Sequence, residues 1–218
     1  MSERRLVIAS DQALVAEAVR VAMSSHGFDT VVLPWGQPLP EDAPEAEAAL
    51  LGLMITDLET LPKLHAGRRL VSTFHGRWLL LTATPKGPVW GAMLESGVRI
   101  ILPSGATLDD TMEVLERLAE GEDVGDDKER QALVARWVSE RTSREQMLVR
   151  VGSLTPRERT VLRLLFDGDK VSTIADRLDI SQTTVRSHVR SLLRKLGVNS
   201  QLAAVAAYGW LQGEKPRR

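Results

Sequence analysis

The sequence predicts a doubly wound α/β domain with a five-stranded parallel sheet, followed by a helical linker and an all-α C-terminal domain. Within residues 1–120, short apolar segments alternate with segments whose apolar residues recur at helical spacing. The short segments are apolar throughout rather than at every second position, which is typical of parallel strands covered by helices on both faces. Residues 151–218 carry helical patterns only, which predicts the all-α domain.

Strands and helices alternate through residues 1–120. The expected strands are 5–9, 28–33, 51–56, 78–82 and 98–102. The expected helices are 12–26, 64–74, 89–95 and 107–119, and Gly27 ends the first of them. Between the second and third strands, four prolines permit only a short helix, around residues 42–49.

The linker, residues 121–150, begins with GEDVGD and continues as one long helix over 127–149. The two ends of this helix are apolar on one side, whereas its middle, SERTSREQ, is polar all round. The pattern predicts a spacer whose ends dock on other elements, a second copy of the chain among them. Packing within its own chain alone is the alternative. The last six residues, GEKPRR, are expected to be disordered.

Composition excludes several classes of protein. The 218 residues include no cysteine, so neither disulfides nor thiolate metal sites can form. The N-terminus lacks the apolar segment of a signal peptide, and no apolar run approaches the roughly 18 residues that a membrane span needs. We therefore expect a cytoplasmic protein without a membrane partner. Walker loop, HExxH motif and nucleophile elbow are all missing, so the sequence supports no enzymatic activity.

Charge is distributed unevenly along the chain. The net charge is −1 for the whole chain, but −6 for residues 1–120, −2 for 121–149 and +7 for 150–218, where 13 basic residues face 6 acidic ones. A basic third on an otherwise acidic chain is typical of a nucleic-acid-binding module. A solvated basic surface is the alternative.

The sequence features that mark the beginnings and ends of helices are clearest in residues 153–211. A helix over 156–166 begins with Thr155 as N-cap and Pro156 at the first helical position. Glu158, three residues after the cap, completes a capping box.

Two further helices follow and are joined by a tight polar turn. The first is 172–178, the turn is 179–181, and the second is 182–196, which Gly197 ends. This arrangement predicts a helix-turn-helix at about residues 171–190.

The longer of these helices has two distinct faces at roughly 100° per residue. The apolar face consists of Val185, Val189, Leu192 and Leu196. Polar and basic residues occupy or flank the opposite face: Thr183, Arg186, Ser187, Arg190, Arg194 and Lys195. The helix contains no acidic residue. Such a stripe suits the DNA major groove, where arginine binds guanine edges and further basic residues bind phosphates.

The chain resembles the LuxR/NarL/FixJ family of bacterial transcriptional regulators. LTPRERTVLRLL, IADRLDISQTTVRSHVRSLLRKLGV and the helix after Ser200 carry the resemblance. It implies a four-helix LuxR-type DNA-binding domain at 151–218, a double-stranded DNA operator as partner, and a homodimer that pairs through the last helix. Base contacts are implied for Arg186, Ser187 and Arg190. Phosphate contacts are implied for Lys170, Thr184, Arg194 and Lys195, and Thr183 lies on the same face.

With such a C-terminal domain, residues 1–120 resemble a response-regulator receiver. In that family, two acidic residues after the first strand and an aspartate after the third hold Mg²⁺. A hydroxyl and a lysine contact the transferred phosphoryl group. Asp57 aligns with the phosphoacceptor, Asp11 with one of the two acids and Thr82 with the hydroxyl.

Four positions depart from the receiver pattern. Ser10 replaces one acid, Ser104 replaces the lysine, Ile101 replaces an aromatic residue, and Pro62 follows Asp57 by five residues, one more than usual. The missing carboxylate weakens Mg²⁺ binding, and the missing lysine leaves the charge that develops on the phosphoryl group uncompensated. Each loss costs on the order of a few kcal/mol.

Weaker candidates lie in the loops around the expected sheet. Lys86, in the loop after the fourth strand, is a possible substitute for the missing lysine. Trp35, Trp78 and Trp90 lie near strand ends, where they either line a small-molecule pocket or fill the core.

Three interpretations follow. The leading one is a dimeric, sequence-specific DNA-binding regulator with an atypical receiver, without cofactor, that a small ligand, a protein partner or dimerisation itself controls. The alternative is a conventional two-component regulator phosphorylated at Asp57 by a sensor kinase, with Mg²⁺ held by Asp11 and Asp57. The third is an interaction adaptor that does not bind DNA and holds a protein with its C-terminal helices.

Overall fold

The chain folds into two compact units, residues 1–139 and 140–218. The structure, a computed structural model, describes residues 4–36, 51–74, 76–122 and 124–212. Helix α5 (Asp127–Gly152) contributes its first half to the first unit and its second half to the second. In the part of the chain that the structure describes, no helix is long and apolar enough to cross a membrane.

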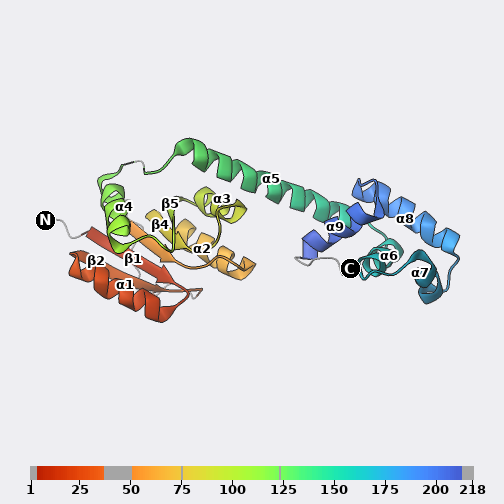
Figure 1. Ribbon diagram of the computed structural model, residues 1–218, viewed down its shortest axis with the longest axis horizontal. Coiled ribbons are helices and arrows are strands. Elements are labelled where there is room, and N and C mark those ends of the chain that lie inside the picture. Colours follow the sequence, from red (N-terminus) through yellow and green to blue (C-terminus); the bar gives the residue numbers. More distant parts are fainter. Residues whose placement is uncertain (1–3, 37–50, 75, 123, 213–218) are drawn as a thin grey trace. The chain divides into compact units, whose positions relative to one another are not determined.

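The first unit is built on a sheet with the strand order β2-β1-β3-β4-β5, in which every neighbouring pair is parallel (Figure 1). The strands are β1 (Arg4–Ser10), β2 (Phe28–Pro34), β3 (Leu51–Ile55), β4 (Arg77–Thr82) and β5 (Val98–Pro103). The predicted five-stranded parallel sheet is confirmed. The strand order reverses between β1 and β3, and in open α/β sheets ligands bind at the carboxyl edge beside such a reversal.

Helices pack on both faces of this sheet. They are α1 (Ala13–Ser25), α2 (Leu61–Thr73), α3 (Pro88–Glu95) and α4 (Leu108–Glu120). Helix α2 begins three residues earlier than predicted because Pro62 occupies its first turn, where a missing N–H is tolerated. The helix expected around 42–49 and the tail 213–218 lie outside the described residues.

Alternate strand residues enter two separate cores, one on each face of the sheet. The core beneath α1 and α4 includes Leu6, Ile8, Leu53, Leu79, Ala16, Met23, Leu115 and Leu118. The core beneath α2, α3 and the first half of α5 includes Val7, Ala9, Met54, Leu80, Leu64, Val71, Met93 and Trp78. Trp78 is fully buried and its Nε1 donates to the Phe74 carbonyl oxygen at 3.0 Å, so it fills the core. Burial on both faces explains why the middle residues of β1, β3 and β4 are apolar in succession.

The first half of α5 lies in close contact with α3. Its apolar residues Leu133, Val134 and Trp137 pack against the core, and Trp137 Nε1 donates to Glu95 Oε2 at 2.9 Å. A Cβ atom on Gly91 of α3 would lie 2.2 Å from the Leu133 carbonyl oxygen. The apolar start of the linker helix therefore docks within its own chain.

Gly91→Ala is expected to loosen this part of α5, because the added methyl group meets backbone atoms that cannot rotate away. Overpacking of this kind costs about 1–3 kcal/mol. Hydrogen exchange of the α5 amides should become faster around Leu133. Gly105→Ala is the matched control, since its Cβ would meet nothing within 4 Å. Equal exchange in the two variants would contradict the close packing.

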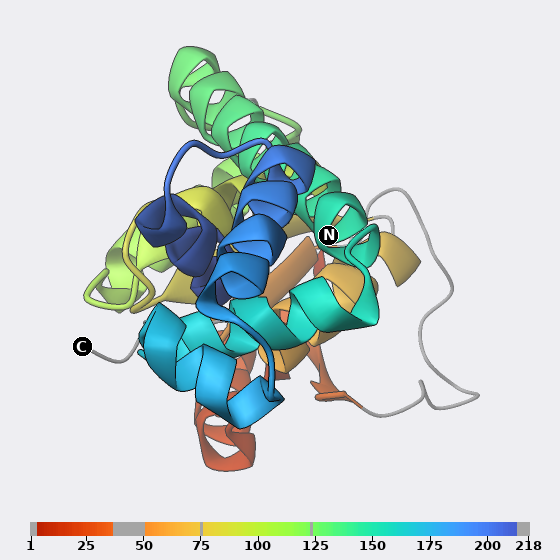
Figure 2. The same ribbon diagram turned by 90° about the vertical axis from the view of Figure 1, so that its right-hand side faces the viewer.

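The second unit consists of helices around one core (Figure 2). With the second half of α5 they are α6 (Pro156–Phe166), α7 (Val171–Leu178), α8 (Gln182–Leu196) and α9 (Gln201–Gln212). Helix α8 packs against α6 and α7, and α9 packs against α6. The Phe166 and Tyr208 rings meet edge to face, with centroids 5.5 Å apart. The predicted all-α C-terminal domain is confirmed.

Candidate nucleic-acid interface and acidic pocket

A tight turn joins α7 to α8. Asp179, at the end of α7, has a left-handed φ of 52°, a conformation that aspartate tolerates better than most residues. The Ile180 N–H donates to the Ala175 carbonyl oxygen at 3.1 Å and closes α7. Ser181 Oγ accepts from the Thr184 N–H at 3.1 Å and so caps α8. These bonds hold the two helices in the geometry of a helix-turn-helix.

Helix α8 buries one face and exposes the other. Val185, Val189, Leu192 and Leu196 are at most 5% exposed and form part of the core. Most of the residues expected to contact DNA are exposed: Lys170, Thr183, Thr184, Arg186, Ser187, Arg190 and Arg194. Because α8 carries no acidic side chain, this exposed face is purely polar and basic.

Lys195 has a different environment from the other expected contacts. Its Nζ lies 2.7 Å from Glu158 Oε2, and its side chain is 31% exposed against 5% for Glu158. Glu158 Oε2 also accepts from the Thr155 N–H at 2.8 Å, which completes the capping box of α6. Burial raises the pKa of Glu158, but Lys195 and Thr155 outweigh this effect and lower the pKa to about 2. The phosphate contact expected of Lys195 stays a prediction, and the pairing with Glu158 is a role that the sequence did not indicate.

The loops after β3 and β4 are joined by hydrogen bonds at the carboxyl edge of the sheet. Asp57 Oδ1 accepts from the Ala83 N–H at 2.8 Å. Thr84 Oγ1 accepts from the Leu58 N–H at 2.8 Å, and Thr82 Oγ1 accepts from the Thr84 N–H at 3.1 Å. The carboxylate of Asp57 and the hydroxyl of Thr82 therefore both bind backbone amides of the loop that follows β4.

Asp11 forms an ion pair with Lys63, which lies in the first turn of α2. Lys63 Nζ is 2.6 Å from Asp11 Oδ2, and the Asp11 side chain is only 12% exposed. Burial raises the pKa of Asp11, but Lys63 and Thr56 outweigh it, so the pKa is lowered. The bond to Asp11 raises the pKa of Lys63, and the charge of Asp57 acts in the same direction. The acidic pocket, by which we mean the surroundings of Asp11 and Asp57, thus contains a cation that the chain itself supplies, the Lys63 ammonium.

The sequence is similar to those of known regulatory proteins. Residues 152–207 match the luxR family of bacterial regulatory proteins. The nitrate/nitrite response regulator protein homolog of Haemophilus influenzae is 32% identical over 154 residues, which cover 71% of this chain and 68% of that protein. This chain belongs to the NarL-type response regulators. NarL of Escherichia coli strain K12 is 30% identical over 158 residues, 72% of this chain and 68% of NarL. A solved structure of RcsB bound to DNA has 21% identity and a TM-score of 0.43, and it covers 95% of this chain and 98% of that one.

The NarL-type regulators are DNA-binding transcription regulators, and α7 and α8 of this member form the helix-turn-helix within the matched region. Receivers of this family hold Mg²⁺ among carboxylates, and this member has fewer carboxylates at the corresponding positions. Ser10 replaces one carboxylate and is buried, with its Oγ accepting from the Gln12 N–H at 3.1 Å. The Lys63 ammonium occupies one oxygen of Asp11. Among the described residues, no three His, Cys, Asp or Glu side chains are grouped closely enough to hold a metal ion.

The missing lysine of this NarL-type receiver has no evident replacement after β4 or β5. Lys86 pairs with Glu129 in the first turn of α5, and its ammonium lies 6.0 Å from the Trp90 ring centroid. Ser104 is exposed, and its N–H donates to the Thr82 carbonyl oxygen at 2.9 Å. Lys63 is the residue that sequence reasoning missed. The one feature of the sequence that indicated a change near Lys63 was the longer spacing between Asp57 and Pro62. This spacing alters the start of the helix that carries Lys63.

Proposed function

We propose that this NarL-type regulator is a cytoplasmic homodimer that binds a specific double-stranded DNA operator and is controlled without phosphorylation of Asp57. In this proposal the exposed face of α8 enters the major groove, and Arg186, Ser187 and Arg190 contact base edges. Phosphate contacts come from Lys170, Thr184, Arg194 and Lys195, and Thr183 lies on the exposed face of α8. The exposed, acid-free face of α8 supports this assignment.

Dimerisation is supported by exposed apolar side chains on α9. Leu202 is 76% exposed and Trp210 is 41% exposed, although both are large and apolar. Ala204, by contrast, is fully buried and belongs to the core of its own unit. A two-fold dimer would place two copies of α8 on successive turns of the same DNA face.

The ion pair between Lys63 and Asp11 carries the proposal that phosphorylation does not control the receiver. Phosphoryl transfer needs a divalent cation and fixed positive charge to offset the oxygens of the transferred group. Here Mg²⁺ would have to displace the Lys63 ammonium from Asp11, and it would then find Ser10 in place of a second carboxylate. Control by a small ligand or a protein partner is consistent with this arrangement, because neither requires metal at Asp57.

Incubation of the full-length protein with Mg²⁺ and a small phosphodonor tests the proposal by intact mass. We expect no stoichiometric gain of about 80 Da, the mass of one phosphoryl group. The alternative, a conventional regulator phosphorylated by a sensor kinase, is favoured by the retention of Asp57 and Thr82 at the sheet edge. A full gain of mass that is lost in Asp57→Asn would establish that alternative.

Lys63→Ala is expected to increase the affinity of the receiver for Mg²⁺, by about tenfold or more, because it frees the carboxylate of Asp11. Titration of the full-length variant with Mg²⁺ by calorimetry measures the change. Lys128→Ala is the matched control, since Lys128 is an exposed lysine of the same unit and lies outside the pocket. If Lys63→Ala and wild type bound Mg²⁺ equally, the ammonium would not be what excludes the metal.

A further inference from the structure

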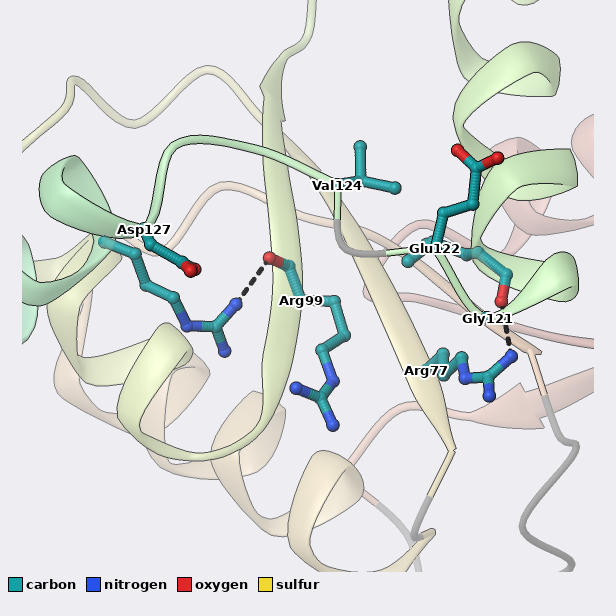
Figure 3. Close-up of a pocket in the computed structure, with 8 residues that line it drawn as sticks. Arg77, Arg99, Gly121, Glu122, Val124 and Asp127 are labelled. Atoms are coloured by element: carbon teal, nitrogen blue, oxygen red, sulfur yellow. Dashed lines mark hydrogen bonds between the residues drawn. The ribbon is translucent and has the colours of Figure 1, made fainter.

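A cavity of about 130 Å³ lies at the amino-terminal edge of the sheet, at the opposite end of the strands from Asp57 (Figure 3). Three arginines from different elements line it. Arg77 is the first residue of β4, Arg99 is the second residue of β5, and Arg130 lies at the start of α5. Three guanidinium groups, distant in sequence, therefore surround one small space.

Two of these arginines also join elements of the first unit. Arg77 Nη1 donates to the carbonyl oxygens of Leu118 at 2.6 Å and Ala119 at 3.3 Å, which are at the end of α4. Arg130 donates to the carbonyl oxygens of Arg99 at 2.8 Å and Val98 at 3.0 Å, which joins α5 to β5. These bonds hold the cavity wall in place. They leave Nη2 of Arg77 without a protein acceptor among the described residues.

Arg99 differs from the other two because its guanidinium has no structural role. Its side chain is exposed, and the residues that the structure describes offer it neither a hydrogen bond nor an ion pair. Figure 3 shows it between the other elements of the cavity, directed into the open space. A basic side chain with unused donors beside a cavity is suited to an anionic ligand.

Acidic residues near the cavity compensate only part of this charge. Glu122 lines it, but its Oε2 accepts from Arg117 Nε at 2.8 Å, and in Figure 3 its carboxylate points away from Arg77 and Arg99. Asp127 lies at the other side of the cavity. Among the described residues that line the first cavity, three arginines therefore face two carboxylates, which gives a net positive charge.

A second cavity of about 130 Å³ adjoins the first and is more apolar. The two share Arg99, Val124, Asp127 and Arg130 in their walls. The apolar walls of the second come from Trp90, Leu94 and Leu133, which belong to α3 and α5. Asp126 and Glu129 line it as well, but Asp126 Oδ1 accepts from the Lys128 N–H at 2.8 Å and Glu129 pairs with Lys86. The arginines of the first cavity thus lie beside a second cavity that is more apolar than the first.

We propose that the two cavities together bind a small monocarboxylate with an aryl or short acyl body. Its carboxylate binds Arg99 and the unused Nη2 of Arg77, and its body lies against Leu94 and Leu133. A compact inorganic anion would leave the apolar compartment unused, whereas a neutral apolar molecule would leave the guanidinium groups without a partner. The inference rests on the proposed function, because it supplies the ligand by which a receiver without phosphorylation is controlled. The occupied site would adjoin the first turns of α5.

Calorimetric titration of the full-length protein with benzoate and with hexanoate tests the site. We expect saturable binding of at least one of them, and binding about tenfold or more weaker in Arg99→Gln, which removes a charged donor from an exposed position. Arg69→Gln is the matched control, because Arg69 is an exposed arginine of α2 in the same unit and lines neither cavity. Benzyl alcohol has the apolar body without the negative charge, and inorganic phosphate has the charge without the apolar body. Both should bind more weakly than the carboxylates.

Three results would overturn the proposal. They are the absence of saturable binding of both carboxylates, equal binding by wild type and Arg99→Gln, and phosphate binding as tight as that of benzoate. None of these depends on Asp57. Conversely, phosphorylation of Asp57 would refute the proposed mode of control and leave the carboxylate isotherm unchanged, so the two failures are distinguishable.

Discussion

Glu158→Gln is expected to lower the free energy of unfolding of the second unit by about 2–3 kcal/mol. Glu158 is 4% exposed and accepts hydrogen bonds from Lys195 and from the Thr155 N–H. The amide preserves the shape of the side chain but removes its charge, which leaves the Lys195 ammonium without a counter-ion. Breaking a fully buried ion pair costs about 3–5 kcal/mol. The expected loss is smaller because the Lys195 side chain is 31% exposed.

The same carboxylate should make the stability of the second unit depend on acid pH. Folding lowers the pKa of Glu158 from 4.5 to about 2, so its contribution is fully present above pH 4.5 and is lost as the pH falls to about 2. A shift of this size corresponds to about 3 kcal/mol. Wild type should therefore lose stability over this interval more steeply than Glu158→Gln does.

Urea unfolding followed by hydrogen exchange at the α6 and α8 amides measures both effects on the full-length protein. Asp176→Asn is the matched control, because it also converts a carboxylate into an amide in the second unit, but at an exposed position of α7. If Glu158→Gln were as stable as Asp176→Asn, the buried ion pair would contribute nothing.

Arg186→Ala and Arg190→Ala are each expected to weaken operator binding by about 1–3 kcal/mol and to relax specificity. Both residues are exposed on the acid-free face of α8, and neither contributes to the core. Bidentate contacts of arginine with guanine discriminate between bases, so affinity for unrelated DNA should fall less than affinity for the operator. An operator selected from random DNA, compared with scrambled DNA by fluorescence anisotropy, measures the difference.

Two controls separate base contacts from general charge. Arg163→Ala removes an exposed arginine of α6 and should leave both affinities unchanged. Arg194→Ala should weaken binding to all sequences and reduce the salt slope by about one, as expected of a phosphate contact. Unchanged operator affinity in Arg186→Ala and Arg190→Ala would refute their assignment. A salt slope near zero in wild type would favour the adaptor that does not bind DNA.

The sequence was sufficient to predict the elements and their order because these depend on local patterns. The continuous apolar segments of the strands predicted two covered faces, and the structure has them. The stripe of Val185 and Leu192 predicted which face of α8 is buried, and therefore which face Arg190 occupies. Both are consequences of helical or strand periodicity within a few residues.

Interactions between distant residues were not predictable in this way. Lys63 and Asp11 are far apart in sequence and form their ion pair only in the folded chain, so neither local pattern predicts the other residue. The same holds for Glu158, whose capping role was evident but whose bond to Lys195 depends on the packing of α6 against α8. The arginines around the first cavity come from three elements, so no single pattern contains them.

The ion pair of Lys63 with Asp11 has a consequence for how the receiver relates to its surroundings. A metal ion is a solute, and its occupancy of a site varies with its concentration and with competing chelators. The Lys63 ammonium is covalently attached to the helix beside Asp11, so its local concentration is fixed by the fold. Under the proposed mode of control, the charge balance of the pocket would therefore depend on the fold, and neither on magnesium supply nor on a cycle of phosphoryl gain and hydrolysis.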